Sequence, residues 1–151
     1  MNNHVVQVQI RRLPHGVGVD LPAYQTEHAA AADLHAAVAQ DTVVPPGEIR
    51  LIPCGFAVAI PPGYELQIRP RSGLAAKFGI SLPNSPGTID ADYRGEVLVA
   101  LINHGEAEFV VTRNMRIAQM LVAPVWRIGW EEVETLSSTA RGAGGFGHTG
   151  R

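Results

Sequence analysis

Three separated segments of this sequence combine residue types that bind phosphate or move a proton. The first, residues 70–75, reads Pro-Arg-Ser-Gly-Leu-Ala and places a guanidinium, a hydroxyl and a glycine amide at the expected start of a short helix. Ser72 is the predicted N-cap. Unpaired amides and the helix dipole attract anions at such a position, which predicts a phosphate-binding loop. A capped helix beside a solvated arginine is the alternative.

The second segment, residues 84–96, begins with turn-forming residues and continues with two carboxylates that are two positions apart, an aromatic ring and an arginine. If residues 87–93 form a hairpin, Asp90 and Asp92 point to opposite faces because side chains alternate along a strand. One of them then faces a pocket while the other pairs with an arginine, so they are not an acid–base pair on one substrate atom. A solvated acidic turn is the alternative.

The third segment, residues 141–151, contains so much glycine that we expect it to be mobile unless something captures it. It also carries an arginine, a phenylalanine and a threonine among glycines that allow close approach of the backbone. These groups suit a lid that folds over a phosphorylated ligand with a ring. A disordered terminus without a role is the alternative.

Composition narrows the class of protein. A chain of 151 residues with 46% hydrophobic and 17% charged residues fits one globular domain. The net charge of -2 argues against wrapping nucleic acid or docking on an acidic membrane. Lys77 is the only lysine among twelve cationic residues, and the other eleven are arginines, which suit bidentate contacts with phosphate.

The remaining composition signals concern cysteine and targeting segments. Cys54 is the only cysteine and lies in an apolar run, so we expect a buried core thiol and neither a disulfide framework nor a thiolate zinc cluster. We expect no signal peptide, because alternating Val and Gln follow the first four residues, and no membrane span, because no apolar run approaches about 20 residues. The predicted location is therefore cytoplasmic.

Alternation of apolar and polar residues predicts the elements that must position these segments. Turns rich in proline, glycine and asparagine separate the expected strands, a pattern typical of a sandwich or jelly roll. The strands are expected at residues 6–10, 56–60, 64–68, 97–102, 109–112 and 117–122. Residues 29–40 are so rich in alanine that helix propensity alone favours a helix there.

Five segments in this order resemble the homotrimeric dUTPases, which are dUTP pyrophosphatases. They are residues 31–36, 70–75, 84–96, 116–119 and 141–150. The second, third and fifth are the most specific, whereas Ala31-Ala32 stand where the family usually has glycine and a bulky residue before the aspartate. The resemblance implies an all-β distorted jelly roll of the β-clip type, with at most one short helix. Residues 1–140 would form the β domain and residues 141–151 the lid, with Asp33 on a strand.

The resemblance implies an activity, which is hydrolysis of dUTP to dUMP and pyrophosphate by attack of water on the α-phosphorus. Such an enzyme limits uracil incorporation into DNA and provides dUMP for dTMP synthesis. Asp90 corresponds to the carboxylate that orients and deprotonates the water. Mg²⁺ is the implied cofactor, chelated by the triphosphate, and Asp33 is its outer-shell partner through water.

The resemblance also implies the substrate contacts. Phosphates would be bound by residues 70–75, by Gln119 and by the lid, and Arg116 would orient Asp90. Phe146 would stack on uracil, and Tyr93 would exclude a 2′-hydroxyl. The implied binding residues are Arg71, Ser72, Gly73, Asn84, Thr88, Ile89, Asp90, Tyr93, Leu98, Arg116, Gln119, Arg141, Phe146 and Thr149. Each site would take residues 70–75 and 116–119 from one subunit, residues 84–96 from a second, and the lid from the third.

Two other functions are compatible with this fold class. A dCTP deaminase, or its bifunctional relative, would share the fold and the phosphate loop, but it normally carries a glutamate base in a different hairpin and lacks the Gly-Gly-Phe-Gly lid. A non-catalytic binding module would have kept the scaffold alone. The joint presence of Arg71, Asp90, Tyr93 and Phe146 argues against it.

Overall fold

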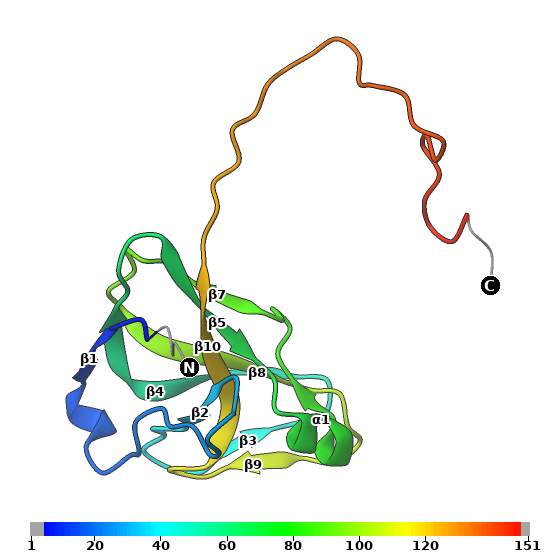
Figure 1. Cartoon of the computed structure of the whole chain (residues 1–151). Coiled ribbons are helices and arrows are strands. Elements are labelled where there is room, and N and C mark those ends of the chain that lie inside the picture. The colour runs from blue at the N-terminus through cyan, green and yellow to red at the C-terminus, as the bar shows by residue number, and fades with distance from the viewer. Residues whose placement is uncertain (1–4, 149–151) are drawn as a thin grey trace.

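The computed structural model describes residues 5–148, and its regular secondary structure consists mainly of antiparallel strands (Figure 1). Its elements are β1 (Gln9–Arg12), the 3-10 helix η1 (Pro14–Gly16), β2 (Ala32–His35), β3 (Thr42–Val44), β4 (Ile49–Ala59), β5 (Tyr64–Arg69), α1 (Ser72–Phe78), β6 (Ile80–Ser81), β7 (Gly87–Ile89), β8 (Glu96–Asn103), β9 (Phe109–Val111) and β10 (Arg116–Pro124). The predicted all-β fold with one short α-helix is confirmed. None of the helices in the described residues is long and apolar enough to cross a membrane.

The strands form three sheets. Two are four-stranded, with the orders β1-β4-β8-β6 and β2-β10-β5-β7, and the third pairs β3 with β9. Leu34 and Ile117 from the second sheet and Phe56 and Leu101 from the first belong to one buried apolar cluster. Burial in that cluster raises the pKa of Cys54 to about 12, so the prediction of a buried core thiol is confirmed.

The alanine-rich stretch contains strand β2 and not a helix. Ala32–His35 pairs with β10, and all four residues are buried, as are Ala36 and Ala37 beyond them. Pairing with β10 and burial of all four side chains outweigh an intrinsic helix preference that is only a few tenths of a kcal/mol per residue, roughly. The strand expected for Asp33 is confirmed.

Several boundaries differ from the sequence expectation, and strand β4 already begins at Ile49, well before the expected residue 56. Strand β1 begins at Gln9, so Val6 and Val8 precede it. Helix α1 has Arg71 as its N-cap, with extended backbone and no side-chain hydrogen bond, and Ser72 is its first helical residue. The prediction of a Ser72 cap is therefore wrong by one position, because Pro70 and Arg71 already supply the extended backbone from which the helix starts.

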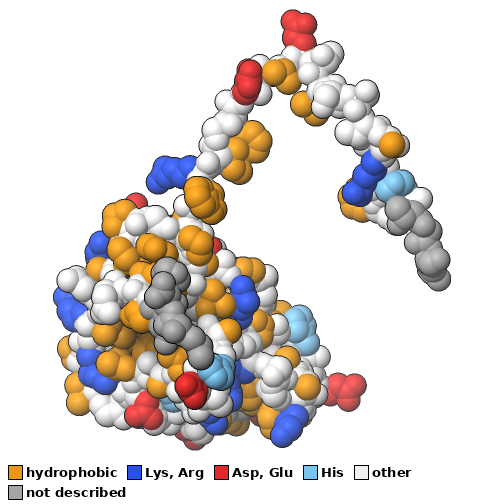
Figure 2. All heavy atoms as spheres, viewed as in Figure 1, with side chains coloured by type: hydrophobic (Ala, Val, Ile, Leu, Met, Phe, Trp, Pro, Cys, Tyr) orange, Lys and Arg blue, Asp and Glu red, His pale blue; other side chains and the backbone are white. Residues whose placement is uncertain are grey.

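The chain after β10 leaves the body as an extended arm, residues 125–148, drawn from orange to red in Figure 1. Figure 2 shows apolar side chains along this C-terminal arm. Trp126 and Trp130 are 91% and 87% exposed. Large aromatic side chains rarely stay in water without a partner, so the arm carries apolar surface that this chain does not cover.

Candidate active site

A pocket of about 180 Å³ opens between β7 and the start of β8, and we call it the β7–β8 pocket. Its lining comprises Ile68, Asn84, Gly87, Thr88, Ile89, Asp90, Tyr93, Glu96, Val97 and Leu98. All six residues implied for the 84–98 segment are among them. The structure thus brings together the groups expected from this part of the chain at the base and its sugar, whereas Phe146, expected to stack on uracil, is not part of the lining.

The predicted hairpin is wrong, although the pocket is present. Strand β7 pairs with β5, and β8 pairs with β4 and β6, so the two strands belong to different sheets. A turn at residues 90–95 joins them, closed by a 3.1 Å hydrogen bond from the amide of Tyr93 to the carbonyl of Asp90. The pocket therefore lies where the two sheets separate, and its walls come from both.

Tyr93 is held at the mouth of this pocket. Its hydroxyl donates a 2.9 Å hydrogen bond to the carbonyl of Glu96, and the residue is 42% exposed. A Cβ on Gly95 would lie 2.4 Å from the tyrosine oxygen. Glycine at position 95 is therefore required for the ring to lie against the turn.

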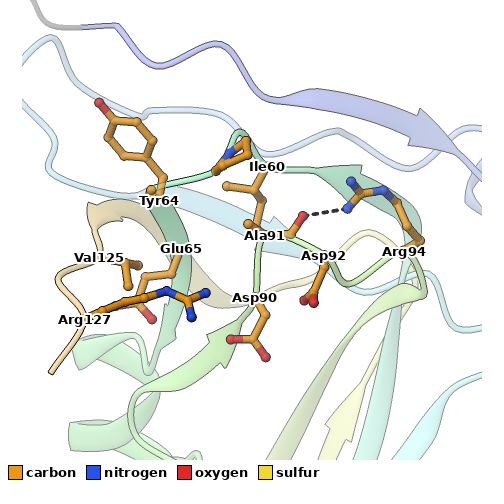
Figure 3. Close-up of a pocket in the computed structure, with 11 residues that line it drawn as sticks. Ile60, Tyr64, Glu65, Asp90, Ala91, Asp92, Arg94, Val125 and Arg127 are labelled. Atoms are coloured by element: carbon orange, nitrogen blue, oxygen red, sulfur yellow. Dashed lines mark hydrogen bonds between the residues drawn. The ribbon is translucent and has the colours of Figure 1, made fainter. Parts of the chain in front are cut away.

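Asp90 also borders a larger open pocket of about 590 Å³, which includes Glu65, Asp92 and Arg127 (Figure 3). Both aspartates line it, so the prediction of opposite faces is wrong. Alternation does not apply because the chain leaves the extended conformation after Ile89. The expected arginine partner is also wrong within residues 5–148, where neither carboxylate has a cationic nitrogen within 4.0 Å.

Arg94, the nearest arginine in sequence, holds the turn itself. Its Nη1 donates to the carbonyls of Ala91, at 2.7 Å, and Tyr93, at 2.9 Å, and Figure 3 shows the first of these bonds. Charge-assisted bonds to two carbonyls restrain the backbone between them. The turn that carries both aspartates is thus fixed by Arg94.

The phosphate-binding candidates gather in a second group, which we call the Asp33 cluster: Asp33, Arg71, Arg116 and Gln119. Arg116 Nη1 donates to Asp33 Oδ2 at 3.1 Å, and Arg71 Nε lies 3.5 Å from Asp33 Oδ1. Arg71 Nη1 donates to the carbonyl of Arg116 at 3.0 Å, and Gln119 Nε2 to the carbonyl of Pro70 at 2.7 Å. Two guanidinium groups therefore share one carboxylate, which leaves an excess of positive charge suited to phosphate.

Strand β10 explains how three distant segments meet in this cluster. It lies between β2 and β5, and its register places Gln119 opposite both Asp33 and Arg69. The chain leaves β5 at Arg69 and enters α1 directly, which brings residues 70–73 beside the strand. A Cβ on Gly73 would meet no atom within 4 Å, so packing within this chain does not require a glycine there.

His35 joins this region although the sequence analysis did not single it out. The residue is 7% exposed, and its Nδ1 has no hydrogen-bond partner among the described residues. Burial lowers the pKa of His35 from its ordinary value, while Asp20 and Asp33 oppose that shift and the cluster arginines add to it. Only its position two residues after Asp33 on the same strand could have indicated it.

The implied site residues fall into three separate groups within one chain. Arg71, Arg116 and Asp33 line neither pocket that Asp90 borders. Arg141 and Phe146 lie on the C-terminal arm, where Arg141 Nε donates to the carbonyl of Gly144 at 2.8 Å. Thr149, also implied, lies outside the described residues. Within the described residues of one chain, the groups implied for phosphate and for the nucleoside are thus not joined in one pocket.

A family model, a curated relative and solved structures all relate this chain to the same kind of protein. A model of the dUTPase family matches residues 18–150. The chain is 60% identical over 147 residues to the deoxyuridine 5′-triphosphate nucleotidohydrolase of Maricaulis maris (strain MCS10), covering 96% of this chain and 97% of that protein. The dUTPase of Staphylococcus bacteriophage 80alpha with dUPNHPP superposes with a TM-score of 0.85 at 25% identity, over 96% and 99% of the two chains. A mutant dUTPase from phage phi11 of S. aureus, described with a structural Mg(II) ion, shares the fold at 22% identity, with a TM-score of 0.75 over 85% and 97% of the two chains.

Proposed function

The chain belongs to the dUTPase family, and from this membership we propose that its three groups of residues form complete active sites only where three copies of the chain meet. The reaction is hydrolysis of dUTP to dUMP and pyrophosphate. One observation carries the proposal: the Asp33 cluster and the β7–β8 pocket each hold the right groups but do not share a pocket within one chain. A neighbouring copy would bring its pocket to this chain's cluster.

The outer face of the first sheet supports an assembly of this kind. Ile49 and Leu51 on β4 are 50% and 61% exposed, and Leu98 on the paired strand β8 is 38% exposed. Contiguous apolar groups on a sheet face favour contact with another protein surface. Leu98 also lines the β7–β8 pocket, so a second copy on this face would help to close that pocket.

The C-terminal arm supports the exchange of a lid between copies. Trp126, Ile128 and Trp130 alternate along it, and all three are at least 70% exposed. Alternating apolar residues are typical of a strand with one buried face, and such a strand needs a partner. We infer that the arm packs on a neighbouring copy and places residues 141–151, with Arg141, Phe146 and Thr149, over that neighbour's nucleotide.

Asp90 is the group that we assign to the attacking water. It stands where the β7–β8 pocket meets the larger open pocket, so a water held on its carboxylate can reach a phosphate at the mouth of the smaller one. A carboxylate is a weak base at neutral pH, and the rate must therefore depend on position and on stabilisation of developing charge. Arg116 of another copy would orient Asp90, and Gln119, Arg71, Ser72 and Gly73 of that copy would bind the phosphates.

The residues present fit a magnesium ion carried by the substrate. No group of three or more His, Cys, Asp or Glu side chains suited to a metal occurs in the described part of the chain. Asp33 is the carboxylate of the Asp33 cluster, and both its oxygens face arginines. A contact with Mg²⁺ through water therefore suits it better than direct ligation of the ion. When bound, Mg²⁺ neutralises phosphate charge and holds the triphosphate in a reactive conformation.

The β7–β8 pocket accounts for the choice of base and sugar. Its lining includes Asn84, Thr88, Ile89 and Leu98, whose backbone groups would read uracil too closely to admit a methyl group on the base. Tyr93 at the mouth would lie against the deoxyribose where a 2′-hydroxyl would clash. Exclusion by shape and by unpaired hydrogen bonds can each discriminate strongly between substrates.

Parallel assays of pyrophosphate release with dUTP, dCTP, dTTP and UTP test this proposal. We expect dUTP to be preferred, and Asp90→Asn to lower kcat by at least about 100-fold while dUTP binding persists, since the change removes the base without removing volume. Ammonia release from dCTP would indicate a deaminase instead. A variant that retains more than about a tenth of wild-type kcat would show that Asp90 is not the base.

A further inference from the structure

An irregular point in the first sheet lies beside the β7–β8 pocket. The register between β4 and β8 shifts between Pro53 and Ala57, and Gly55 in this bulge has a φ of 73°. A bulge leaves backbone groups without a partner in the ladder, and a buried amide needs another acceptor. The Gly55 amide finds it in Glu96, whose Oε1 accepts a 2.8 Å hydrogen bond.

The same carboxylate oxygen binds a second segment. His15 Nε2 lies 2.6 Å from Glu96 Oε1, and because a carboxylate can only accept, the ring nitrogen donates. His15 belongs to η1, which packs tightly on the bulge: the amide of Leu13 donates to the carbonyl of Gly55 at 2.8 Å, and a Cβ on Gly16 would lie 2.1 Å from that carbonyl oxygen. Glu96 thus ties the start of β8 to β4 and to η1.

The backbone of Glu96 contacts a residue of the pocket wall. Its carbonyl accepts the hydrogen bond from the hydroxyl of Tyr93, and the residue itself is part of the pocket lining. The side chain therefore anchors the peptide unit that holds the tyrosine ring. Bulges beside active sites commonly re-aim a side chain, and here the bulge is linked to the ring through one residue.

We propose that Glu96 is a positioning residue for recognition of the deoxyribose, because its carboxylate fixes the backbone acceptor that holds the Tyr93 ring at the pocket mouth. The inference rests on the proposed role of Tyr93 in excluding a 2′-hydroxyl. It assigns to Glu96, Gly55 and His15 an effect on sugar selectivity, although none of the three was implied as a substrate contact.

The test measures sugar selectivity separately from stability. In Glu96→Ala, the ratio of kcat/KM for dUTP to that for UTP should fall at least about fivefold, while the ratio for dUTP to dTTP stays within about twofold. Glu96→Gln keeps an acceptor for the Gly55 amide and should retain the wild-type sugar ratio. Glu48→Ala is the matched control, since it removes a carboxylate from a surface pair with Arg50 (2.6 Å) away from the pocket.

A double-mutant cycle shows whether Glu96 acts through Tyr93. In a Tyr93→Ala background, Glu96→Ala should change the sugar ratio no further, because the ring that it positions is absent. Tyr93→Phe removes only the hydroxyl that donates to Glu96, and it should reproduce the loss in sugar ratio even if Glu96→Ala fails to fold.

Three results would overturn the proposal. They are a Glu96→Ala enzyme that melts earlier but keeps the wild-type sugar ratio, an unchanged ratio in Tyr93→Phe, and equal effects of Glu96→Ala with and without the Tyr93 ring. Failure of the proposed function is a different result, namely a wild-type enzyme that does not prefer dUTP. An unchanged ratio in Tyr93→Ala would remove the role of Tyr93 and this inference together.

Discussion

The substitution Asp33→Asn tests two roles of Asp33 in its cluster. One role is to stabilise the folded chain, and the other is to hold two arginines in place. The substitution keeps the shape of the side chain and removes its charge. Asp33 is only 12% exposed at its side chain, and Arg71 and Arg116 are 26% and 44% exposed, so both arginines would then face each other without a carboxylate between them. The loss therefore includes both an attraction and a new repulsion.

The expected cost follows from these contacts. A hydrogen bond between charged groups contributes about 1.5–3 kcal/mol, and solvent screening at the more exposed Arg116 lowers that figure, so we expect a loss of about 2 kcal/mol in the free energy of unfolding. For a chain of this size that corresponds to a fall in Tm of roughly 4–8 °C. Misplaced arginines should also lower kcat/KM for dUTP by about 10–100-fold.

The assay is thermal unfolding of the wild type and of Asp33→Asn at one fixed chain concentration, since association would otherwise shift Tm. Asp41→Asn is the matched control, because Asp41 is exposed and has no ion pair among the described residues. It should change the free energy of unfolding by no more than about 0.5 kcal/mol. If Asp33→Asn had the same Tm as Asp41→Asn, the arginine contacts would not stabilise the chain and the estimated loss in the free energy of unfolding would be refuted.

Three further predictions concern buried groups and the metal. Burial raises the pKa of Cys54 to about 12, so iodoacetamide at about pH 8 should label the unfolded but not the folded chain; rapid labelling of folded protein would contradict this. Burial lowers the pKa of His35 below 6.5, so on acidification the unfolded state takes up the proton before the folded state, and the free energy of unfolding should fall as pH decreases below about 6.5. Denaturant titrations over that pH range should show a smaller fall for His35→Asn than for the wild type, and an equal fall in both proteins would refute the prediction. Chelation of divalent ions should lower activity without lowering Tm, because the described residues contain no metal cluster, and a lower Tm would contradict that.

The strands could be predicted because apolar and polar residues alternate over several positions in one sequence segment. The alternation at residues 64–68 falls inside β5. Pairing of strands is not encoded in that way. Strand β7 pairs with β5, which comes earlier in the chain, so the hairpin considered for residues 87–93 does not form.

The contacts of the candidate site residues could not be predicted from the sequence. Asp33 meets Arg116 across 83 positions in sequence, and Glu96 meets His15 across 81, so only the complete fold brings them together. In the sequence Glu96 is only one acidic residue after a glycine. Its proposed role depends on the amide of Gly55, which the β-bulge leaves without a partner in the strand ladder. The burial of His35 depends in the same way on the pairing of β2 with β10.

Hybrid assembly tests the shared site most directly. Asp90→Asn chains and chains lacking residues 141–151 are each expected to be nearly inactive; they are unfolded together, reassembled at equal amounts, and assayed for pyrophosphate release from dUTP. If Asp90 and the lid of one site come from different chains, about a quarter of the sites in randomly mixed trimers would have both, and activity should return. If mass analysis shows hybrid trimers and activity stays at the level of the two parents, each site takes Asp90 and its lid from one chain, and the account is wrong.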